Sequence, residues 1–275
     1  MNAKEMNNSL LKTYRKDVFS KFMKAIRDYK LIEEHDVIAV CISGGKDSMI
    51  MAKCFQLLAR FSAIPFEVKY VVMDPGYSPA NREMIVHNAK RLEIPIEIFD
   101  SKIFESVEHI EKNPCYLCAR MRRGYLYRFA KELGCNKIAL GHHYDDVIET
   151  TLMNLFYAGE VRTMMPKLHA TNFKGMQLIR PLYLVREDDI LAWKDYVGMD
   201  FLQCACRFTE DIEKADHEHS SKRKEVKQLV KELHQSNPYI ESNIFHSMSN
   251  VNLDKVLAYY DDEHEVSFLD TYNDK

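Results

Sequence analysis

The sequence predicts an α/β protein whose core is a parallel sheet, extended by helices at both ends of the chain. Short apolar runs rich in β-branched residues alternate with segments of helical periodicity. This alternation indicates βαβ units, whose parallel strands are covered by helices on both faces. A glycine-containing string joins the first apolar run to the first helix, and open parallel sheets bind ligands at the carboxyl ends of their strands. We therefore expect the functional site at that edge.

The N-terminal segment, residues 1–35, predicts one amphipathic helix. Its apolar side chains recur at steps of three and four: Leu11, Tyr14, Val18, Phe22, Ile26 and Tyr29. We expect this helix to pack on the main body of the protein, and a contact between the two copies of a homodimer is the alternative.

The central domain is expected to span residues 36–200. Its predicted strands are 37–42, 66–73, 95–99 and 137–140, and its predicted helices are 48–61, 81–92, 119–133, 147–157 and 190–197. Residues 201–275 predict a cysteine-containing segment followed by helices at 222–235 and 239–248. The last dozen residues are acidic, and we expect them to fray.

The bulk composition excludes several classes of protein. The 275 residues carry a net charge of −3, so any nucleic-acid binding must come from a local basic patch. No run of about 18 apolar residues is present, which argues against a membrane span. The first 30 residues are charged throughout and do not resemble a signal peptide. We expect a cytoplasmic protein that makes no membrane contact.

Residues 43–48 (SGGKDS) predict an anion-binding loop between a strand and a helix. They fit neither the Walker loop nor the dinucleotide fingerprint, because the glycine spacing is wrong for both. Adjacent glycines bring backbone amides close to a ligand, and the following helix offers free N–H groups. Ser43 and Ser48 add hydroxyls, Lys46 adds a cation, and Asp47 is expected to cap the helix or to help hold Mg²⁺. The alternative is a simple turn before a capped helix.

Further polar residues follow the other predicted strands. Asp74 ends the second strand, where it is expected near adenine or ribose, although turn formation explains it nearly as well. Residues 141–146 (GHHYDD) follow the fourth strand. Asp145 or Asp146 is either a helix N-cap or a carboxylate that orients Mg²⁺. We favour His142 and Asp146 as site residues.

The seven cysteines point to metal or redox chemistry, because their number is odd and no export signal is present. The Cys115-x-x-Cys118 pair fits zinc, an iron–sulfur cluster or a redox disulfide, and the redox interpretation requires a different fold. With Cys204 and Cys206 a four-cysteine zinc site is a fair alternative. A cluster held by three cysteines would leave one iron open, which suits sulfur transfer. The other three are expected to be small buried hydrophobic residues: Cys41, Cys54 and Cys135.

Two basic runs are candidates for nucleic-acid contacts. Arginines at 120, 122, 123 and 128, with Lys131, follow the first cysteine pair, where the phosphates of a nucleic acid would match them. A solvated helix face is the simpler explanation. For the run 222–224 (KRK), solvation is the default interpretation.

Residues 43–48 match the pyrophosphate-loop motif, and the chain resembles the PP-loop ATPases. Enzymes of that superfamily cleave ATP between the α and β phosphates, adenylate a carbonyl-type oxygen and release pyrophosphate. Four further features select one family within that superfamily: the first cysteine pair, the run 120–124 (RMRRG), residues 141–146, and a later cysteine pair after 180–182 (RPL). Over residues 15–250 the chain is similar to the tRNA 2-thiocytidine synthetases.

That resemblance implies a Rossmann-like fold of the adenine nucleotide alpha hydrolase type, together with ATP, Mg²⁺ and a [4Fe-4S] cluster. It implies Cys115, Cys118 and Cys204 as cluster ligands. Cys206 is the alternative to Cys204, because one residue separates the later pair where the family usually has two. The ATP-binding residues implied are Ser43, Gly44, Gly45, Lys46, Asp47, Ser48, Asp74 and Gly141.

The implied activity is that of an ATP-dependent tRNA-cytidine 2-sulfurtransferase, which releases AMP and pyrophosphate. The implied catalytic residues are Lys46, Asp47, His142 and Asp146, and the implied tRNA-binding residues are Arg120, Arg122 and Arg123. Expected partners are tRNA and a sulfur donor, either a cysteine desulfurase or sulfide. The alternatives are a PP-loop enzyme with a structural zinc site that acts on uridine or a small metabolite, and a non-catalytic RNA-binding module.

Overall fold

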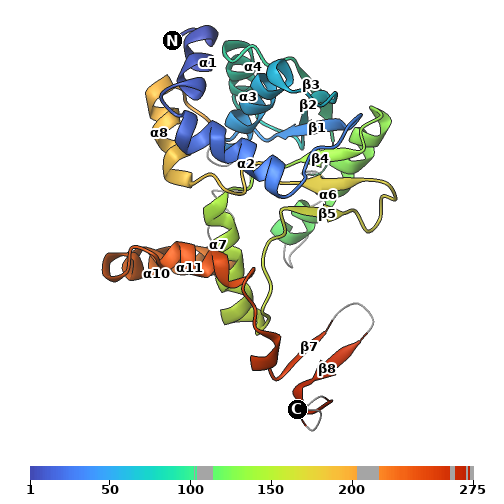
Figure 1. Cartoon of the computed structure of the whole chain (residues 1–275). Coiled ribbons are helices and arrows are strands. Elements are labelled where there is room, and N and C mark those ends of the chain that lie inside the picture. Colours follow the sequence, from blue (N-terminus) through green and yellow to red (C-terminus); the bar gives the residue numbers. More distant parts are fainter. Residues whose placement is uncertain (102, 104–113, 203–216, 261–263, 271, 273–275) are drawn as a thin grey trace.

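The computed structural model describes residues 1–101, 103, 114–202, 217–260, 264–270 and 272, with the backbone alone for 114–120 and 217–221. Its centre is a six-stranded sheet in the order β3-β2-β1-β4-β6-β5 (Figure 1). The strands are β1 Val37–Ile42, β2 Glu67–Asp74, β3 Ile96–Asp100, β4 Lys137–Ala139, β5 Lys167–His169 and β6 Gln177–Ile179. The four predicted strands are therefore confirmed.

Two strands of the sheet were not predicted. Strand β6 pairs parallel with β4, but β5 pairs antiparallel with β6, so the sheet is mostly rather than wholly parallel. Each of these strands has only three residues. A three-residue strand is too short to produce a recognisable apolar run, which explains why the sequence pattern missed both.

The side chains of β1 alternate between two buried faces, as expected for a central parallel strand. Ile38, Val40 and Ile42 belong to the larger core, and Ala39 and Cys41 belong to a second core on the opposite face. Helices α3 Lys46–Phe61, α4 Pro79–Arg91 and α8 Glu187–Val197 contribute to the larger core, and α6 Pro114–Glu132 contributes to the second. Both faces of the sheet are thus covered, as predicted.

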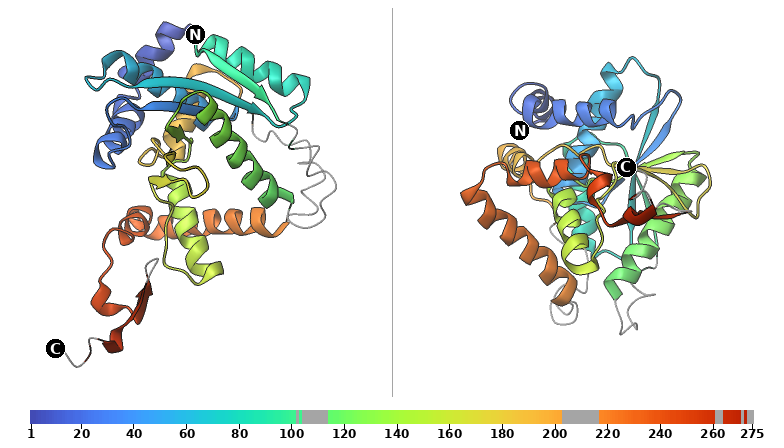
Figure 2. Two further views of the ribbon diagram at one scale, coloured as in Figure 1. Left: turned by 90° about the vertical axis from the view of Figure 1, so that its right-hand side faces the viewer. Right: turned by 60° about the horizontal axis from the view of Figure 1, so that its bottom comes forward.

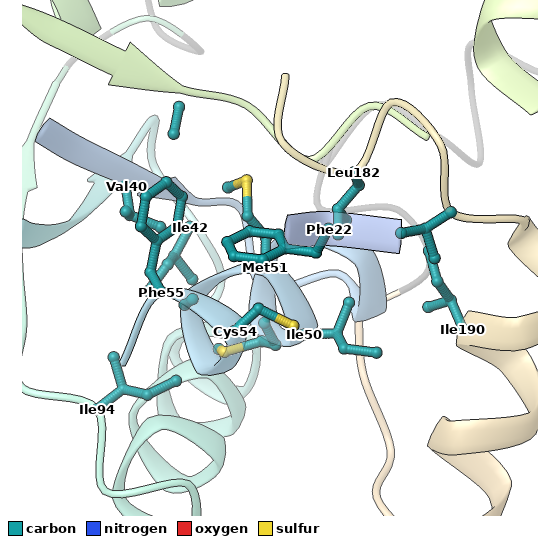
Figure 3. Close-up of a cluster of buried hydrophobic side chains, with 14 of the residues drawn as sticks. Phe22, Val40, Ile42, Ile50, Met51, Cys54, Phe55, Ile94, Leu182 and Ile190 are labelled. Atoms are coloured by element: carbon teal, nitrogen blue, oxygen red, sulfur yellow. The ribbon is translucent and has the colours of Figure 1, made fainter. Parts of the chain in front are cut away.

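The N-terminal segment is two helices rather than the single helix expected. Helix α1 spans Ala3–Leu11 and α2 spans Ser20–Asp28, with a π-helical turn at Arg15–Phe19 between them. The break occurs where the Tyr14 amide donates to Ser9 O, one residue further back than in an α-helix. The apolar stripe still packs on the core as predicted, and the Phe22 ring meets the Phe55 ring edge-on at 5.4 Å between centroids (Figure 3).

The C-terminal part packs on one helix that follows β4. That helix, α7 Tyr144–Met153, continues into a π-helical turn at Asn154–Ala158. Helix α10 His217–Ser236 packs on α7 through a small apolar cluster, and α11 Ile240–Ser247 lies beside both (Figure 1). The apolar cluster contains Ile148, Leu152, Val226 and Val230.

The acidic end of the chain was expected to fray, but it contains a small hairpin. Strands β7 Ala258–Tyr260 and β8 Glu265–Ser267 pair antiparallel, flanked by 3-10 turns at Leu253–Lys255 and Phe268–Asp270. The hairpin is set apart from the body of the protein (Figure 2). Within the described residues no helix is both long and apolar enough to cross a membrane.

Candidate functional site

The loop between β1 and α3 has the geometry of an anion site. Gly44 has a φ of +86°, and a Cβ on it would lie 2.7 Å from Ile85 Cγ1, so only glycine fits there. The Ser43 amide donates to Ser48 Oγ at 3.1 Å, and Ser48 Oγ donates to Gly45 O at 2.9 Å. Gly45 is the N-cap residue, and in the described part of the chain no side chain caps α3. The amides of the first turn are therefore left for a ligand.

This loop lies where the strand order of the sheet reverses. The chain runs outward from β1 to β2 and β3, then returns to place β4 on the other side of β1. Ligands bind at such switch points in open α/β sheets. Gly141 follows β4, and a Cβ there would lie 3.0 Å from Ser48 N and 3.1 Å from the Asp47 carbonyl carbon. A glycine at 141 is thus what allows the two loops to approach each other.

The residues after Gly141 form a helix cap that differs from the one expected. His143 is the N-cap of α7: its Nδ1 accepts from the Asp146 amide at 3.4 Å, and the His143 amide donates to Asp146 Oδ2 at 3.0 Å. The suggestion that Asp145 or Asp146 is the N-cap was wrong. Asp145 instead accepts hydrogen bonds from the Arg186 side chain and the Glu187 amide, which fixes the start of α8.

A cavity of about 520 Å³ opens between the phosphate loop and the ends of β4 and β6. Its charged and titratable lining residues are Asp47, Arg122, Arg123, His142, Asp146 and Arg180. Its apolar lining includes Met73, Leu126, Leu140, Met164 and Leu178. The cavity thus joins an apolar region to a charged one, beside the anion loop.

His142 faces this cavity as a neutral imidazole. Burial lowers the pKa of its side chain to about 4, against the opposing attraction of Asp146. Its Nδ1 is buried and has no hydrogen-bond partner among the described residues. A neutral ring with an unsatisfied nitrogen can accept or donate a proton to a ligand in the cavity.

A second cavity of about 540 Å³ lies on the other side of the loop and shares Ser43, Asp47 and Arg122 with the first. Lys46 opens into it, with Nζ 3.2 Å from both Asp47 Oδ1 and Glu187 Oε1. Burial alone would lower the pKa of Lys46, but the two carboxylates outweigh it and raise the pKa. Lys46 is therefore a fixed cation at the loop.

Asp47 does not cap α3, so that part of the expectation was wrong. Its Oδ1 is buried and accepts no hydrogen bond from the described residues, although the Lys46 ammonium is close. Asp47 and Asp146 line the same cavity. Mg²⁺ is typically held in proteins by one or two carboxylates together with substrate phosphates. Asp47 offers its unpartnered Oδ1 for this role, whereas the two oxygens of Asp146 accept from the His143 amide and from Arg223.

Asp74 forms a turn, as its alternative interpretation stated. Its Oδ1 accepts from the Gly76 and Tyr77 amides at 2.8 and 2.7 Å, and its Oδ2 pairs with Arg82 at 2.9 Å. Arg82 also bridges to Asp100 at 2.6 Å. Both oxygens of Asp74 are thus already engaged, and its contact with adenine or ribose stays a prediction.

Sequence reasoning missed a basic contribution from the C-terminal helix. Arg223 Nη1 lies 2.9 Å from Asp146 Oδ1 and 3.2 Å from Glu149 Oε2, so solvation was the wrong default for this residue. Lys227, one turn further along α10, pairs with Glu187. A charged amphipathic helix has the same pattern whether its cations face water or a neighbour, so the sequence held no signal for these pairs.

The predicted cluster ligands fall largely outside the described residues. Cys115 and Cys118 lie three positions apart at the start of α6, so the backbone places them on one face of the helix. Their side chains, that of Arg120, and the whole of Cys204 and Cys206 are outside the described part. The described residues contain no group of three or more His, Cys, Asp or Glu that could hold a metal ion.

The described residues next to these cysteines lie at the phosphate loop: those that follow Cys118 and those that precede Cys204. Arg122, one turn after Cys118, lines both cavities, and Arg123 lines the first. The Leu202 amide donates to Gly44 O at 3.1 Å, just before the segment that carries the later cysteine pair. The remaining three cysteines are buried as predicted: Cys41, Cys54 and Cys135.

A mostly parallel sheet with an anion loop at its switch point is the arrangement of an α/β nucleotide-binding protein. The PP-loop domain family matches residues 14–233. A tRNA-cytidine(32) 2-sulfurtransferase of Pelobacter propionicus is 36% identical over 233 residues, which cover 83% of each chain. Its namesake in Acaryochloris marina is 37% identical over 237 residues, or 85% of this chain and 80% of the relative. The chain therefore belongs to the PP-loop family and, within it, to the family of the tRNA-cytidine(32) 2-sulfurtransferases.

A solved structure shares this fold. The U34-tRNA thiolase NcsA from Methanococcus maripaludis, solved with its [4Fe-4S] cluster, superposes with a TM-score of 0.68. The match covers 86% of this chain and 78% of the thiolase at 23% sequence identity. It supports the predicted Rossmann-like class of fold.

Proposed function

We propose that this protein is an ATP-dependent tRNA sulfurtransferase that replaces the C2 oxygen of a cytidine with sulfur. The observation that carries the proposal is the anion loop between two cavities, with His142 and a pair of carboxylates beside it. The named relatives act on cytidine 32 of tRNA, and we propose the same nucleotide here.

The first step is adenylation. ATP lies with its base against the apolar part of the first cavity and its β and γ phosphates on the loop amides and Lys46. Asp47 and Asp146 would hold Mg²⁺, which would neutralise part of the phosphate charge. The C2 oxygen of cytosine attacks the α-phosphorus, the oxygen–phosphorus bond forms, and pyrophosphate leaves with the electrons of the broken bond. The amides and the Lys46 cation stabilise the charge that develops.

The second step replaces oxygen with sulfur. Hydrosulfide attacks C2, a carbon–sulfur bond forms, and AMP leaves with the former C2 oxygen. The proton of the attacking hydrosulfide passes to the neutral imidazole of His142, whose Nδ1 is unpartnered among the described residues. A base with a low pKa holds such a proton only briefly and returns to its neutral form.

Cys115 and Cys118 would hold a [4Fe-4S] cluster together with Cys204, with Cys206 as the alternative third ligand. The spacing of the first two on one face of α6 fits this role, and the same helix brings Arg122 to the loop. A cluster with three protein ligands would supply an iron with a free coordination position for sulfide.

Three arginines that follow the cysteines would contact tRNA phosphates: Arg120, Arg122 and Arg123. Arg123 is exposed at the mouth of the cavity, where a backbone phosphate can reach it. An unpaired loop nucleotide can be splayed into a pocket. We further propose a cytoplasmic location, sulfur supply by a cysteine desulfurase or free sulfide, and a homodimer.

The test is a thiolation assay on protein purified without oxygen, with ATP, Mg²⁺, sulfide and two tRNA transcripts that differ in cytidine or uridine at position 32. We expect 2-thiocytidine by mass spectrometry, with one AMP per modified base. Thiolated uridine, or ATP turnover that does not depend on tRNA, would contradict the proposal. In the same sample, iron and sulfide support the cluster, whereas about one zinc per chain without iron would exclude it.

A further inference from the structure

Arg180 is a buried cation in the first cavity, and the two proposed steps give it no role. It follows β6 directly, and only 8% of its surface is exposed. Its Nη1 donates to Met165 O, its amide donates to Pro166 O at 2.9 Å, and its Nε is buried with no hydrogen-bond partner in the described part. The guanidinium is thus held in place but not satisfied.

Arg180 also has no ion-pair partner in the described part of the chain. Three other cations near the phosphate loop do form ion pairs: Lys46 with Asp47 and Glu187, Arg223 with Asp146 and Glu149, and Lys227 with Glu187. No carboxylate among the described residues forms an ion pair with Arg180. A buried and unpaired charge costs folding free energy, which indicates that the missing partner is a ligand.

The surroundings favour an anionic ligand. Arg122 and Arg123 line the same cavity, and the nearby Asp146 already pairs with Arg223. Burial, reinforced by the charge of Arg123, lowers the pKa of Arg180 to about 10. The side chain therefore remains a cation at neutral pH. The phosphates of a tRNA backbone are unsuitable partners, because a residue this deeply buried lies beyond their reach.

The strand order indicates which phosphate Arg180 meets. Strands β1, β4 and β6 lie side by side, and the Leu140 amide donates to Ile179 O at 3.0 Å across the last pair. Their carboxyl ends present, in this order, the anion loop, Gly141 with His142, and Arg180. The loop amides and Lys46 take the pyrophosphate end of ATP. The phosphate bonded to the nucleoside then lies toward β4 and β6.

We propose that Arg180 binds the α-phosphate of the nucleotide, in ATP, in the adenylated base and in AMP. Negative charge grows on this group when the bond between C2 and its oxygen breaks and AMP leaves, so the cation assists the second step as well as the first. This assignment rests on the proposed function for its chemistry. The test is independent of the proposed function, because the binding of AMP and of pyrophosphate to the protein can be measured separately and without tRNA.

The experiment measures the affinities of AMP and of pyrophosphate for the full-length protein by titration calorimetry. Arg180→Met is expected to weaken AMP binding by about tenfold or more, the size of a lost charged hydrogen bond, and to leave pyrophosphate binding unchanged. Without ligand, this variant should unfold at a temperature no lower than wild type, because the substitution removes an unpaired buried charge. Arg27→Gln, on the exposed face of α2, is the matched control and should change neither affinity.

Arg180→Lys provides a second variant that keeps the charge, and it should bind AMP with an affinity between those of wild type and Arg180→Met. If Arg180→Met does not fold, the AMP affinity of Arg180→Lys tests the α-phosphate assignment in its place. Unchanged AMP affinity, or equal losses of AMP and pyrophosphate affinity, would overturn the assignment. Selective loss of AMP binding in a protein whose wild type does not thiolate tRNA would keep Arg180 as an α-phosphate ligand and refute the proposed function instead.

Discussion

Arg223 on α10 lies 2.9 Å from Asp146 on α7, although 77 residues separate them in the chain. The same guanidinium nitrogen reaches Glu149 at 3.2 Å. Burial raises the pKa of Asp146, but the neighbouring His143 and His142, the His143 amide and Arg223 outweigh it and lower the pKa. The C-terminal helix therefore helps to keep this carboxylate ionised, as its proposed role in the site requires.

We expect Arg223→Gln to reduce thiolation activity by about tenfold, because one charge-assisted partner of Asp146 is lost. Arg223→Lys should recover part of that activity. Steady-state kinetics of thiolation at saturating Mg²⁺ provide the measurement. Lys224→Gln alters the exposed neighbour on the same helix and serves as the control. Equal activity of Arg223→Gln and Lys224→Gln would show that the ion pair is dispensable.

A methyl group at Gly141 should disrupt the phosphate loop. The added Cβ would lie 3.0 Å from Ser48 N and 3.1 Å from the Asp47 carbonyl carbon, and backbone atoms cannot move aside without shifting the first turn of α3. We expect Gly141→Ala to lower the melting temperature and to weaken ATP binding in the same preparation. Thermal unfolding with and without ATP measures both.

Gly124→Ala is the matched control for that experiment. A Cβ at Gly124 meets nothing within 4 Å, and the residue lies inside α6. Alanine in a helix interior is more favourable than glycine by about 0.5–1 kcal/mol, so this variant should melt slightly higher than wild type. Similar behaviour of the two variants would mean that the contact between the β4 loop and the phosphate loop is not tight in solution.

Substitutions at the two adjacent histidines should have different effects: His143 should affect the stability of the fold, and His142 the activity. His143 caps α7, and loss of an N-cap side chain costs about 1 kcal/mol, so His143→Ala should be destabilised by that amount in chemical unfolding. His143→Asn should restore most of it, because asparagine is a strong N-cap. His142→Ala should instead keep its stability and lose activity. If His143→Asn is as unstable as His143→Ala, the capping role assigned to this residue is wrong.

The fold could be predicted because the main strands and helices each carry a local signal. The buried strand β1 is a continuous apolar run, and α3 begins at a glycine loop, so neither depends on distant residues. The break between α1 and α2 and the three-residue strands β5 and β6 were not predicted. They result from backbone hydrogen bonds that the apolar pattern does not encode.

The site could be predicted only in part. The loop, His142 and Asp146 follow strand ends, and the topology of a parallel sheet brings such ends together. No site role was predicted for Glu187, Arg223 or Arg180. The roles of Glu187 and Arg223 arise from tertiary ion pairs, and that of Arg180 from the lack of an ion-pair partner among the described residues. A single sequence also could not distinguish His143 from Asp145 or Asp146 as the cap, since all three side chains can accept an amide hydrogen bond. The ligands at 204 and 206 remain predictions.

Glu187 should contribute a pH-dependent part of the stability. Its burial favours the protonated form, but the hydrogen bond from Lys227 and the charge of Lys46 outweigh this and lower the pKa to about 2, from an ordinary value of 4.5. A carboxyl group with a depressed pKa stabilises the folded state above its unfolded pKa and loses that contribution as the pH falls. The free energy of unfolding of wild type minus that of Glu187→Gln should therefore be constant at neutral pH and shrink between about pH 5 and pH 2.

Urea unfolding at intervals across this range measures the difference, with the exposed Glu34→Gln as the control. A difference that does not change over that range would show that the Lys46–Glu187–Lys227 network does not hold this carboxylate in solution.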